Sequence, residues 1–203
     1  MSGRFIVFEG LDGSGKTTQM LETAKRLSDA GYSCVTEFEP TDGEIGRLIR
    51  RALRKEVRIG ADALAMLFAA DRSEHIKRIK NELAKGTVVL CDRYVYSNVA
   101  YQSLELDADT VISYNAGNTA ALMPDTVFYI DTPPEECVRR IAENREEEEL
   151  YERLDILRSV YNNYMDSFKN ASLISKTEVV IIDGKLKTGE ITEKIFSKII
   201  DSL

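Results

Sequence analysis

Short apolar runs alternate with helical patterns along the chain. Five runs rich in β-branched and aromatic residues predict strands at residues 4–9, 33–38, 87–91, 126–130 and 178–182. Between them, apolar residues recur every three or four positions, which predicts amphipathic helices. The predicted buried faces of three of these helices are Met20, Leu21, Ala24 and Leu27, then Ile76, Ile79 and Leu83, and finally Ile191, Ile195 and Ile199.

Strands that alternate with helices in this way predict a parallel sheet, because each helix returns the chain by a right-handed crossover. The strand runs are apolar throughout rather than at every second position, so both faces of the sheet are expected to be covered. No internal repeat, proline-rich linker or low-complexity tract interrupts the chain. The sequence therefore predicts one α/β domain over residues 1–203, with three layers and a five-stranded parallel sheet between helices.

The charge balance restricts the kinds of partner. The chain has 203 residues, and its 27 basic and 34 acidic residues give a net charge of −7. This argues against broad binding to nucleic acid or to an anionic membrane, because both favour basic surfaces. A small anion held in a local basic pocket remains compatible with the acidic average.

Two further features bear on the compartment. The longest apolar run, residues 63–70, is far shorter than a bilayer span, and no signal-peptide pattern precedes the first strand. Cys34, Cys91 and Cys137 are far apart and match no disulfide or zinc spacing. We therefore expect reduced, buried thiols in a cytoplasmic protein.

A glycine-rich segment follows the first strand and precedes a helix. Residues 10–17, GLDGSGKT, match G-x-x-x-x-G-K-[ST] in the context that a phosphate loop requires. Its backbone N–H groups and the helix N-terminus favour a phosphate, Lys16 is expected to reach the β- and γ-phosphates, and Thr17 to ligate Mg²⁺. The chain is thus expected to have a P-loop NTPase-type fold that binds a nucleoside triphosphate. The residues assigned to the nucleotide are Gly10, Leu11, Asp12, Gly13, Ser14, Gly15, Lys16, Thr17 and Thr18.

Asp12 is an unusual residue for an anion-binding loop, because a carboxylate repels phosphate by about 1 kcal/mol or more at contact distance. It is expected to point away from the triphosphate, toward a hydroxyl or a cation. A local hydrogen bond within the turn explains it equally well.

The strand ends favour a kinase over a nucleotide switch. Switches usually carry an Asn-Lys-x-Asp element, and the chain has no Asn-Lys pair. A kinase needs an acceptor site at the carboxyl ends of the strands, where Glu39-Pro40 and Asp92-Arg93 stand. We assign Asp92, with Thr17, to the magnesium ion. An acceptor that already carries a phosphate needs guanidinium groups, which Arg50, Arg72 and Arg93 could supply.

Four segments together resemble the thymidylate kinase family of nucleoside monophosphate kinases. They are residues 10–19 (GLDGSGKTTQ), Glu39-Pro40, residues 68–72 (FAADR) and residues 92–102 (DRYVYSNVAYQ). The resemblance covers most of residues 4–170. It implies ATP- and Mg²⁺-dependent phosphoryl transfer to the 5′-phosphate of dTMP, giving dTDP and ADP, by a homodimer.

The resemblance also implies roles for individual residues. Phe68 would stack on thymine, Arg72 would contact the base, and Arg93 and Arg50 would hold the acceptor phosphate, with Arg93 at the point of transfer. Asp12 would lie near the sugar 3′-hydroxyl. The second-strand end would contribute Glu39 and Pro40, and the base and sugar pocket Ser97, Asn98, Tyr101 and Gln102, of which Tyr101 would crowd the 2′ position. Taken alone, Phe68 reads as a core residue, Arg50 as a surface charge and His75 as a surface or packing residue.

The sequence departs from the family pattern at two places. Phe38 stands where an Arg often precedes the Glu-Pro pair, and Thr41-Asp42 replaces a common Gly-Gly. The phosphate loop has no Arg, so the catalytic Arg is expected in a lid at residues 139–153. That segment offers Arg139, Arg140, Arg145 and Arg153, and we take Arg145 and Arg140 as the catalytic candidates. An exposed charged helix is the alternative for this segment.

Two other functions remain open at this level. One is a nucleoside or nucleotide kinase that acts on another acceptor base. The other is a nucleotide-dependent switch or binding protein with little turnover. Assays with different acceptor nucleotides separate these possibilities.

Overall fold

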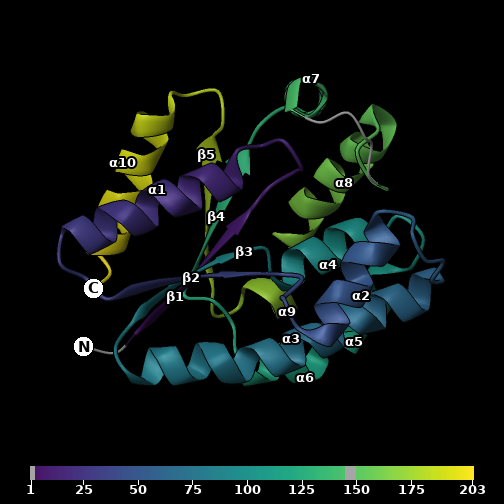
Figure 1. Cartoon of the computed structure of the whole chain (residues 1–203), viewed down its shortest axis with the longest axis horizontal. Helices are drawn as coiled ribbons and strands as arrows, with labels where there is room; N and C mark the ends of the chain where they lie inside the picture. The colour runs from purple at the N-terminus through teal and green to yellow at the C-terminus, as the bar shows by residue number, and fades with distance from the viewer. Residues whose placement is uncertain (1–2, 145–149) are drawn as a thin grey trace.

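The computed structural model describes residues 3–144 and 150–203, in which five strands form one parallel sheet (Figure 1). The spatial order is β2-β3-β1-β4-β5, so β1 lies at the centre with β3 and β4 on either side. The strands are β1 (Arg4–Glu9), β2 (Cys34–Phe38), β3 (Val88–Asp92), β4 (Thr126–Asp131) and β5 (Glu178–Asp183). The predicted parallel sheet is confirmed, and each strand end lies within one residue of its predicted position.

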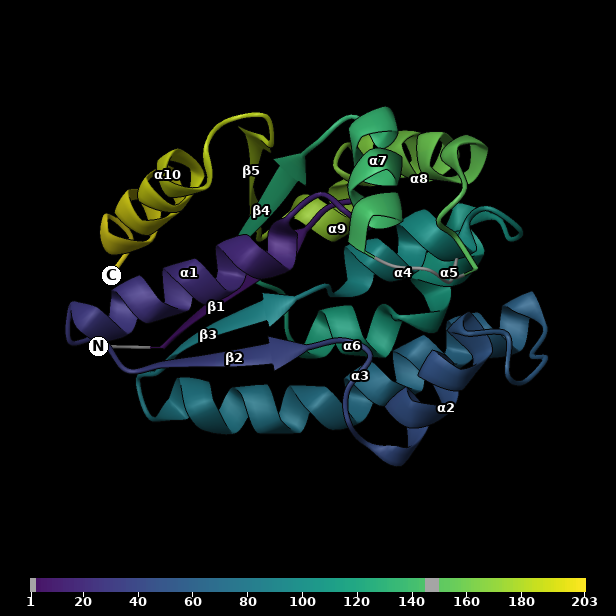
Figure 2. The same ribbon diagram turned by 45° about the horizontal axis from the view of Figure 1, so that its top comes forward.

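Helices connect the strands and cover the sheet. In the described ranges they are α1 (Lys16–Asp29), α2 (Glu44–Leu53), α3 (Ala61–Ala84), α4 (Val95–Gln102), α5 (Ala108–Tyr114), α6 (Ala116–Ala121), α7 (Pro134–Asn144), α8 (Leu154–Ser167), α9 (Ala171–Ile174) and α10 (Thr188–Ile200). Figure 2 shows α1 and α10 on one side of the sheet and α3 on the other. The chain thus forms a three-layer α/β fold, as expected.

Two apolar cores lie between the sheet and the helices that pack on its two faces. On β1, Phe5 and Val7 belong to one core while Ile6 and Phe8 belong to the other, because successive strand side chains point to opposite faces. The first core is shared with α3, α4 and α8, and the second with α1 and α10. Burial on both faces explains why the strand runs are apolar throughout.

The predicted helix faces are confirmed on α10, where all three isoleucines are buried. On α1, Met20 and Leu27 are buried, but Leu21 is 48% exposed, so its assignment to the buried face is wrong. A helix turns by about 100° per residue, which carries Leu21 out of the narrow arc that faces the sheet.

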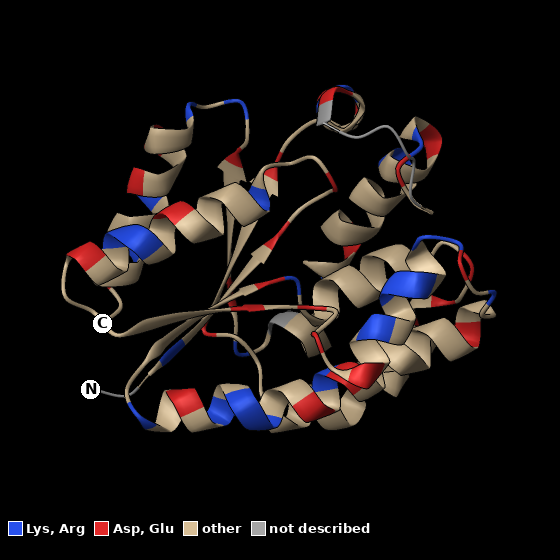
Figure 3. Cartoon of the chain, viewed as in Figure 1, with Lys and Arg blue, Asp and Glu red and all other residues tan. Residues whose placement is uncertain are grey.

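The outer surface is mixed in charge. Acidic and basic residues are interspersed over the helices (Figure 3). In the described parts of the chain, no helix is both long and apolar enough to cross a membrane. All three cysteines are free thiols, with Cys91 and Cys137 buried and Cys34 half-buried.

Three predicted site segments meet at the carboxyl edge of the sheet. The phosphate loop follows β1, Glu39 and Pro40 follow β2, and Arg93 follows β3. Because β3 pairs with both β1 and β2, these segments lie side by side although they are far apart in the sequence. The fold therefore gathers the candidate binding residues at one edge.

Candidate active site

The phosphate loop adopts a conformation that depends on glycine. Gly13 has a φ of 78°, and a Cβ at this position would lie 2.5 Å from the carbonyl oxygen of Cys137. The loop leads into the N-terminus of α1 at Lys16 and borders a cavity of about 440 Å³. Of the residues assigned to the nucleotide, those from Asp12 to Thr18 line this cavity, whereas Gly10 and the buried Leu11 do not.

Lys16 is buried inside the loop. Its Nζ donates to the carbonyl of Leu11 at 3.4 Å and lies 3.8 Å from Asp12 Oδ1. Burial lowers the pKa of Lys16, and the charge of Arg93 acts in the same direction, while nearby carboxylates oppose both. An arriving phosphate would favour the charged ammonium, which is the form that the predicted role requires.

Thr17 and Asp92 meet between the phosphate loop and β3. The Thr17 hydroxyl donates to Asp92 Oδ2. The second oxygen, Asp92 Oδ1, is buried, and no residue that the structure describes donates to it. A hydroxyl and one open carboxylate oxygen suit Mg²⁺, which is usually held by few protein oxygens together with phosphates and water. The residues present therefore fit the predicted ion.

Asp12 bonds across the site rather than within its own turn. Its carboxylate accepts from Arg93 Nη2 at 2.5 Å and from the Tyr101 hydroxyl at 2.8 Å. Burial acts to raise the pKa of Asp12, but the charges of Arg93 and Lys16 outweigh it and hold that pKa well below its ordinary value. Of the two readings of Asp12, the one that points it toward a cation is supported.

Arg93 is held by partners that the sequence did not indicate. It has a φ of 71°, and its Nη1 donates to Ser97 Oγ at 3.0 Å and to the Tyr164 hydroxyl at 3.3 Å. Behind them lies the fully buried carboxylate of Glu9, which accepts from Ser97 Oγ at 2.6 Å and from Tyr164 at 2.8 Å. A charged residue at the end of an apolar strand was the one available signal for Glu9. Tyr164 gave none.

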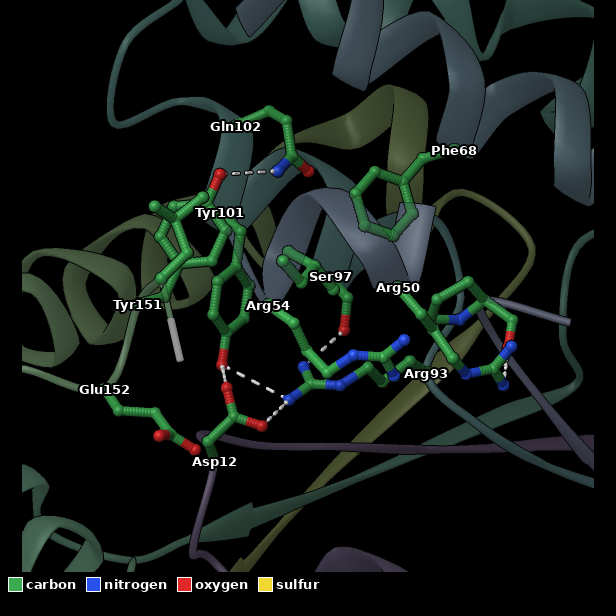
Figure 4. A pocket seen from close by; sticks show the side chains of 13 residues that line it. Asp12, Arg50, Arg54, Phe68, Arg93, Ser97, Tyr101, Gln102, Tyr151 and Glu152 are labelled. Carbon is green, nitrogen blue, oxygen red and sulfur yellow. Dashed lines mark hydrogen bonds and ion pairs between the residues drawn. The ribbon is translucent and has the colours of Figure 1, made fainter. Parts of the chain in front are cut away.

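A second cavity, of about 220 Å³, adjoins the first. In Figure 4, Phe68 and Gln102 lie toward one end, and Asp12 and Arg93 toward the other. Asp12 and Glu152 line both cavities. The predicted acceptor residues that line the second cavity are Asp12, Pro40, Arg50, Phe68, Arg93, Ser97, Tyr101 and Gln102, joined by the unpredicted Leu53, Arg54, Leu150, Tyr151 and Glu152.

Arg50 supports the loop after β2. Its Nη2 donates to the carbonyl of Pro40 at 2.5 Å and its Nη1 to the carbonyl of Thr41. Asp42, one of the departures from the family pattern, lies 3.5 Å from Nη2. The guanidinium thus faces the cavity edge and the loop, and is not a purely solvated charge.

Glu39, Arg72 and Asn98 form a buried chain behind the second cavity instead of lining it. Arg72 is 1% exposed, and its Nε and Nη2 donate to Glu39 at 2.9 and 2.7 Å. Its Nη1 donates to Asn98 Oδ1 at 3.3 Å. Arginine has donors only, and Asn115 Nδ2 donates to the same oxygen at 2.8 Å, so these two contacts direct Asn98 Nδ2 toward Gln102 Oε1, 2.9 Å away. Gln102 Nε2 donates at 3.3 Å to the hydroxyl of Tyr151, and both of these side chains line the cavity.

In the predicted lid, Arg140 of α7 reaches the phosphate loop. Its Nη1 lies 3.3 Å from the carbonyl of Ser14, and the side chain lines the first cavity. Arg139 points outward to Glu136 and Glu143, and Arg153 pairs with Asp155 at the surface. The exposed-helix alternative describes Arg139, whereas Arg153 is exposed but lies in extended backbone just before α8. Arg145, the other catalytic candidate, lies outside the described residues.

Comparison with known proteins decides the family. The family model described as thymidylate kinase matches residues 8–195. This chain belongs to the thymidylate kinase family. A protein named "Probable thymidylate kinase" from Methanococcus aeolicus is 40% identical over 98% of this chain and 96% of its own length. Another of that name from Pyrococcus horikoshii is 43% identical over 81% of this chain and 82% of its own length. One from Methanocaldococcus jannaschii is 38% identical over 98% of this chain and 95% of its own length. The predicted resemblance is confirmed.

Proposed function

We propose that this thymidylate kinase family member transfers the γ-phosphoryl group of ATP to the 5′-phosphate of dTMP, giving dTDP and ADP. The observation that carries the proposal is the pair of adjoining cavities. One is lined by the phosphate loop and the other by Phe68, Arg93 and Tyr101, and both share Asp12. A donor and an acceptor bound in these cavities would meet at Asp12 and Arg93.

The chain's residues supply alignment and charge neutralisation. The acceptor phosphate is an anion near neutral pH, so transfer needs no strong general base. Lys16 in the phosphate loop and Arg93 on the acceptor side would stabilise the negative charge on the transferred phosphoryl group. Arg140 or Arg145 would add a third cation from the lid. Thr17 and Asp92 would hold a Mg²⁺, whose chemistry would be to neutralise part of the phosphate charge.

We assign the second cavity to the thymine deoxynucleotide. Phe68 would stack on the base at one end, and Arg50 and Arg93 would bind the phosphate at the other. Tyr101, whose hydroxyl bonds to Asp12 at 2.8 Å, would occupy the space that a ribose 2′-hydroxyl needs. Arg72 and Asn98 would act on the base from the second layer, through Gln102.

One assay tests this function against its rivals. The protein is mixed with ATP, Mg²⁺ and, in turn, dTMP, dUMP, dCMP and AMP, and ADP formation is measured. Turnover fastest with dTMP supports the proposal. Faster turnover with another nucleotide would assign a different acceptor base, and ATP binding without turnover would favour a switch. Asp92→Asn should raise the Mg²⁺ concentration needed for half-maximal rate, whereas unchanged Mg²⁺ dependence would argue against this ligand.

We also propose a homodimer that works in the cytoplasm, as the family resemblance implies. Light scattering coupled to size-exclusion chromatography measures the mass directly. A mass near twice 22.9 kDa is expected. A mass of one chain would contradict the dimer.

A further inference from the structure

His75, the only histidine of the chain, is buried between two carboxylates. Its side chain is 0% exposed, with Nδ1 3.0 Å from Glu39 Oε1 and Nε2 3.1 Å from Glu37 Oε2. The surface alternative for His75 is therefore wrong. A neutral imidazole has one N–H and one acceptor nitrogen, so it can donate to only one of two ionised carboxylates. An imidazolium donates from both nitrogens, and the geometry matches this form.

The surroundings of His75 sustain that charge. Arg72 also binds Glu39, and Arg78 also binds Glu37; burial acts to raise the pKa of Glu37, but its contacts with His75 and Arg78 outweigh burial and lower that pKa. Burial acts to lower the pKa of His75, but its hydrogen bonds to the two carboxylates outweigh burial and raise that pKa above its ordinary value. The titratable and charged groups around His75 and its carboxylates are Glu37, Glu39, Asp71, Arg72, Arg78, Cys91, Asp92 and Tyr94.

A continuous series of hydrogen bonds leads from His75 to the second cavity. His75 holds Glu39, Glu39 holds Arg72, and Arg72, together with Asn115 to which it also donates, sets the orientation of Asn98. Asn98 in turn donates to Gln102 Oε1, and Gln102 Nε2 donates to the hydroxyl of Tyr151 at the cavity wall. Each step pairs a donor with an acceptor, so loss of the donor at His75 loosens the whole series.

We propose that His75 is a positioning residue whose imidazolium holds Glu39 and Arg72 in place and thereby fixes Gln102, whose Nε2 would donate to the base of the acceptor. The inference rests on the proposed function. Thymine carries a carbonyl acceptor where cytosine carries an amino donor, so a fixed set of donors favours thymine. The affinity for dTMP is therefore expected to be highest below the pKa of His75 and to fall as the pH rises through that pKa.

The protonation state can be measured without any substrate. Because the untagged protein has one histidine, its ring carbon-bound proton signal in an NMR titration reports on His75 alone. The expected midpoint lies above the ordinary value of about 6.5. Glu37→Gln should lower the midpoint, because it removes one of the two carboxylates. A ring that is neutral throughout pH 6–8 in the wild type would overturn the proposal.

The positioning role is tested by dTMP affinity, measured by calorimetry without ATP from pH 6 to 9, and by KM and kcat. His75→Gln should weaken dTMP binding on the order of ten-fold and remove the loss of affinity at high pH, with kcat changed less than about two-fold. Lys77→Gln, at an exposed pair with Glu74 on the same helix, is the matched control and should bind dTMP as the wild type does. Titration of the dTMP phosphate, with a pKa of about 6, affects all variants alike and cancels in the comparison.

If His75→Gln does not fold, Glu37→Gln carries the test. Its affinity profile should shift to lower pH together with its NMR midpoint. A midpoint that shifts while the affinity profile does not would overturn the positioning role, as would a folded His75→Gln with wild-type affinity. A wild-type protein that binds dTMP but does not phosphorylate it contradicts the proposed function only. Absence of dTMP binding overturns both.

Discussion

Arg93 and Asp12 form an ion pair of 2.5 Å across 81 residues of sequence, at the point where the two cavities meet. Arg93 follows β3 and Asp12 lies in the loop after β1, so the pairing of these two strands brings them together. In this state Asp12 neutralises part of the positive charge of Arg93, the cation that we propose binds the acceptor phosphate. Arg93 nevertheless keeps its second terminal nitrogen on Ser97 and Tyr164, which fixes the guanidinium plane.

Arg93→Lys is expected to lower kcat on the order of 10²-fold. A lysine has one terminal nitrogen, so it cannot bind Asp12 and Ser97 in the fixed geometry of a guanidinium. Both side chains experience the positive φ equally, so the fold should not change. Steady-state kinetics with dTMP measures the effect, and Arg158→Lys, at an exposed pair with Glu135, is the control. A kcat close to that of the control would show that Arg93 does not act on the transferred group.

Phe68→Ala is expected to raise the KM for dTMP and leave ATP binding unchanged, because Phe68 lines the second cavity but not the first. Leu64→Ala is the matched control on the same helix, since Leu64 is buried in a small apolar cluster between α2 and α3 against which Phe68 packs, but does not line the cavity. It should cost about 2–5 kcal/mol in stability and leave the KM unchanged. Thermal unfolding and kinetics are measured together. If Phe68→Ala behaves as Leu64→Ala does, its role is packing alone.

Arg140→Ala is expected to lower kcat far more than it alters dTMP affinity. In related phosphate-loop enzymes an arginine of this kind contributes ~10³–10⁵ to turnover, and Arg140 is the described lid residue whose guanidinium lies against the phosphate loop. Arg139→Ala, one residue away but directed outward, should keep kcat within about two-fold. Arg145→Ala is measured beside them. If all three keep near-normal kcat, the lid-arginine mechanism is wrong.

Lys16→Ala is expected to lower kcat by about 10²–10³-fold or more, because no other ammonium lies within the loop. The mutant should remain folded, since the hydrogen bond that Lys16 makes in this structure, to the carbonyl of Leu11, is a long one of 3.4 Å. Circular dichroism and a thermal melt provide the check on folding. Turnover within a few-fold of the wild type would contradict the predicted contact with the phosphates.

The thiols are expected to react slowly in the native protein. Burial raises the pKa of Cys34 to about 11, so at pH 8 little of it is the reactive thiolate. The rate of modification of Cys34 by a disulfide reagent should rise about ten-fold per pH unit up to that pKa, whereas unfolded protein should react readily. A plateau near pH 9 would indicate an ordinary thiol.

Local patterns determined most of the fold. Strand runs, helical periodicity and the phosphate loop each depend on residues close together in the sequence, so they can be read without knowing which strands pair. The right-handed crossover rule then restricted the arrangement to a parallel sheet. The family motifs supplied most of the residues around the second cavity, because each motif lies on one short segment such as residues 92–102.

Tertiary structure decided which of those residues touch each other and which face a cavity. The placement of Glu39, Arg72 and His75 in one buried chain depends on the packing of α3 against β2 and β3, and 36 residues separate Glu39 from His75. Likewise, Arg140 reaches the phosphate loop and Arg139 does not, although they are neighbours, because a turn of about 100° separates their directions on the helix. A lone charged residue has no periodic pattern to reveal its partner, so its contacts follow only from the way the strands and helices pack.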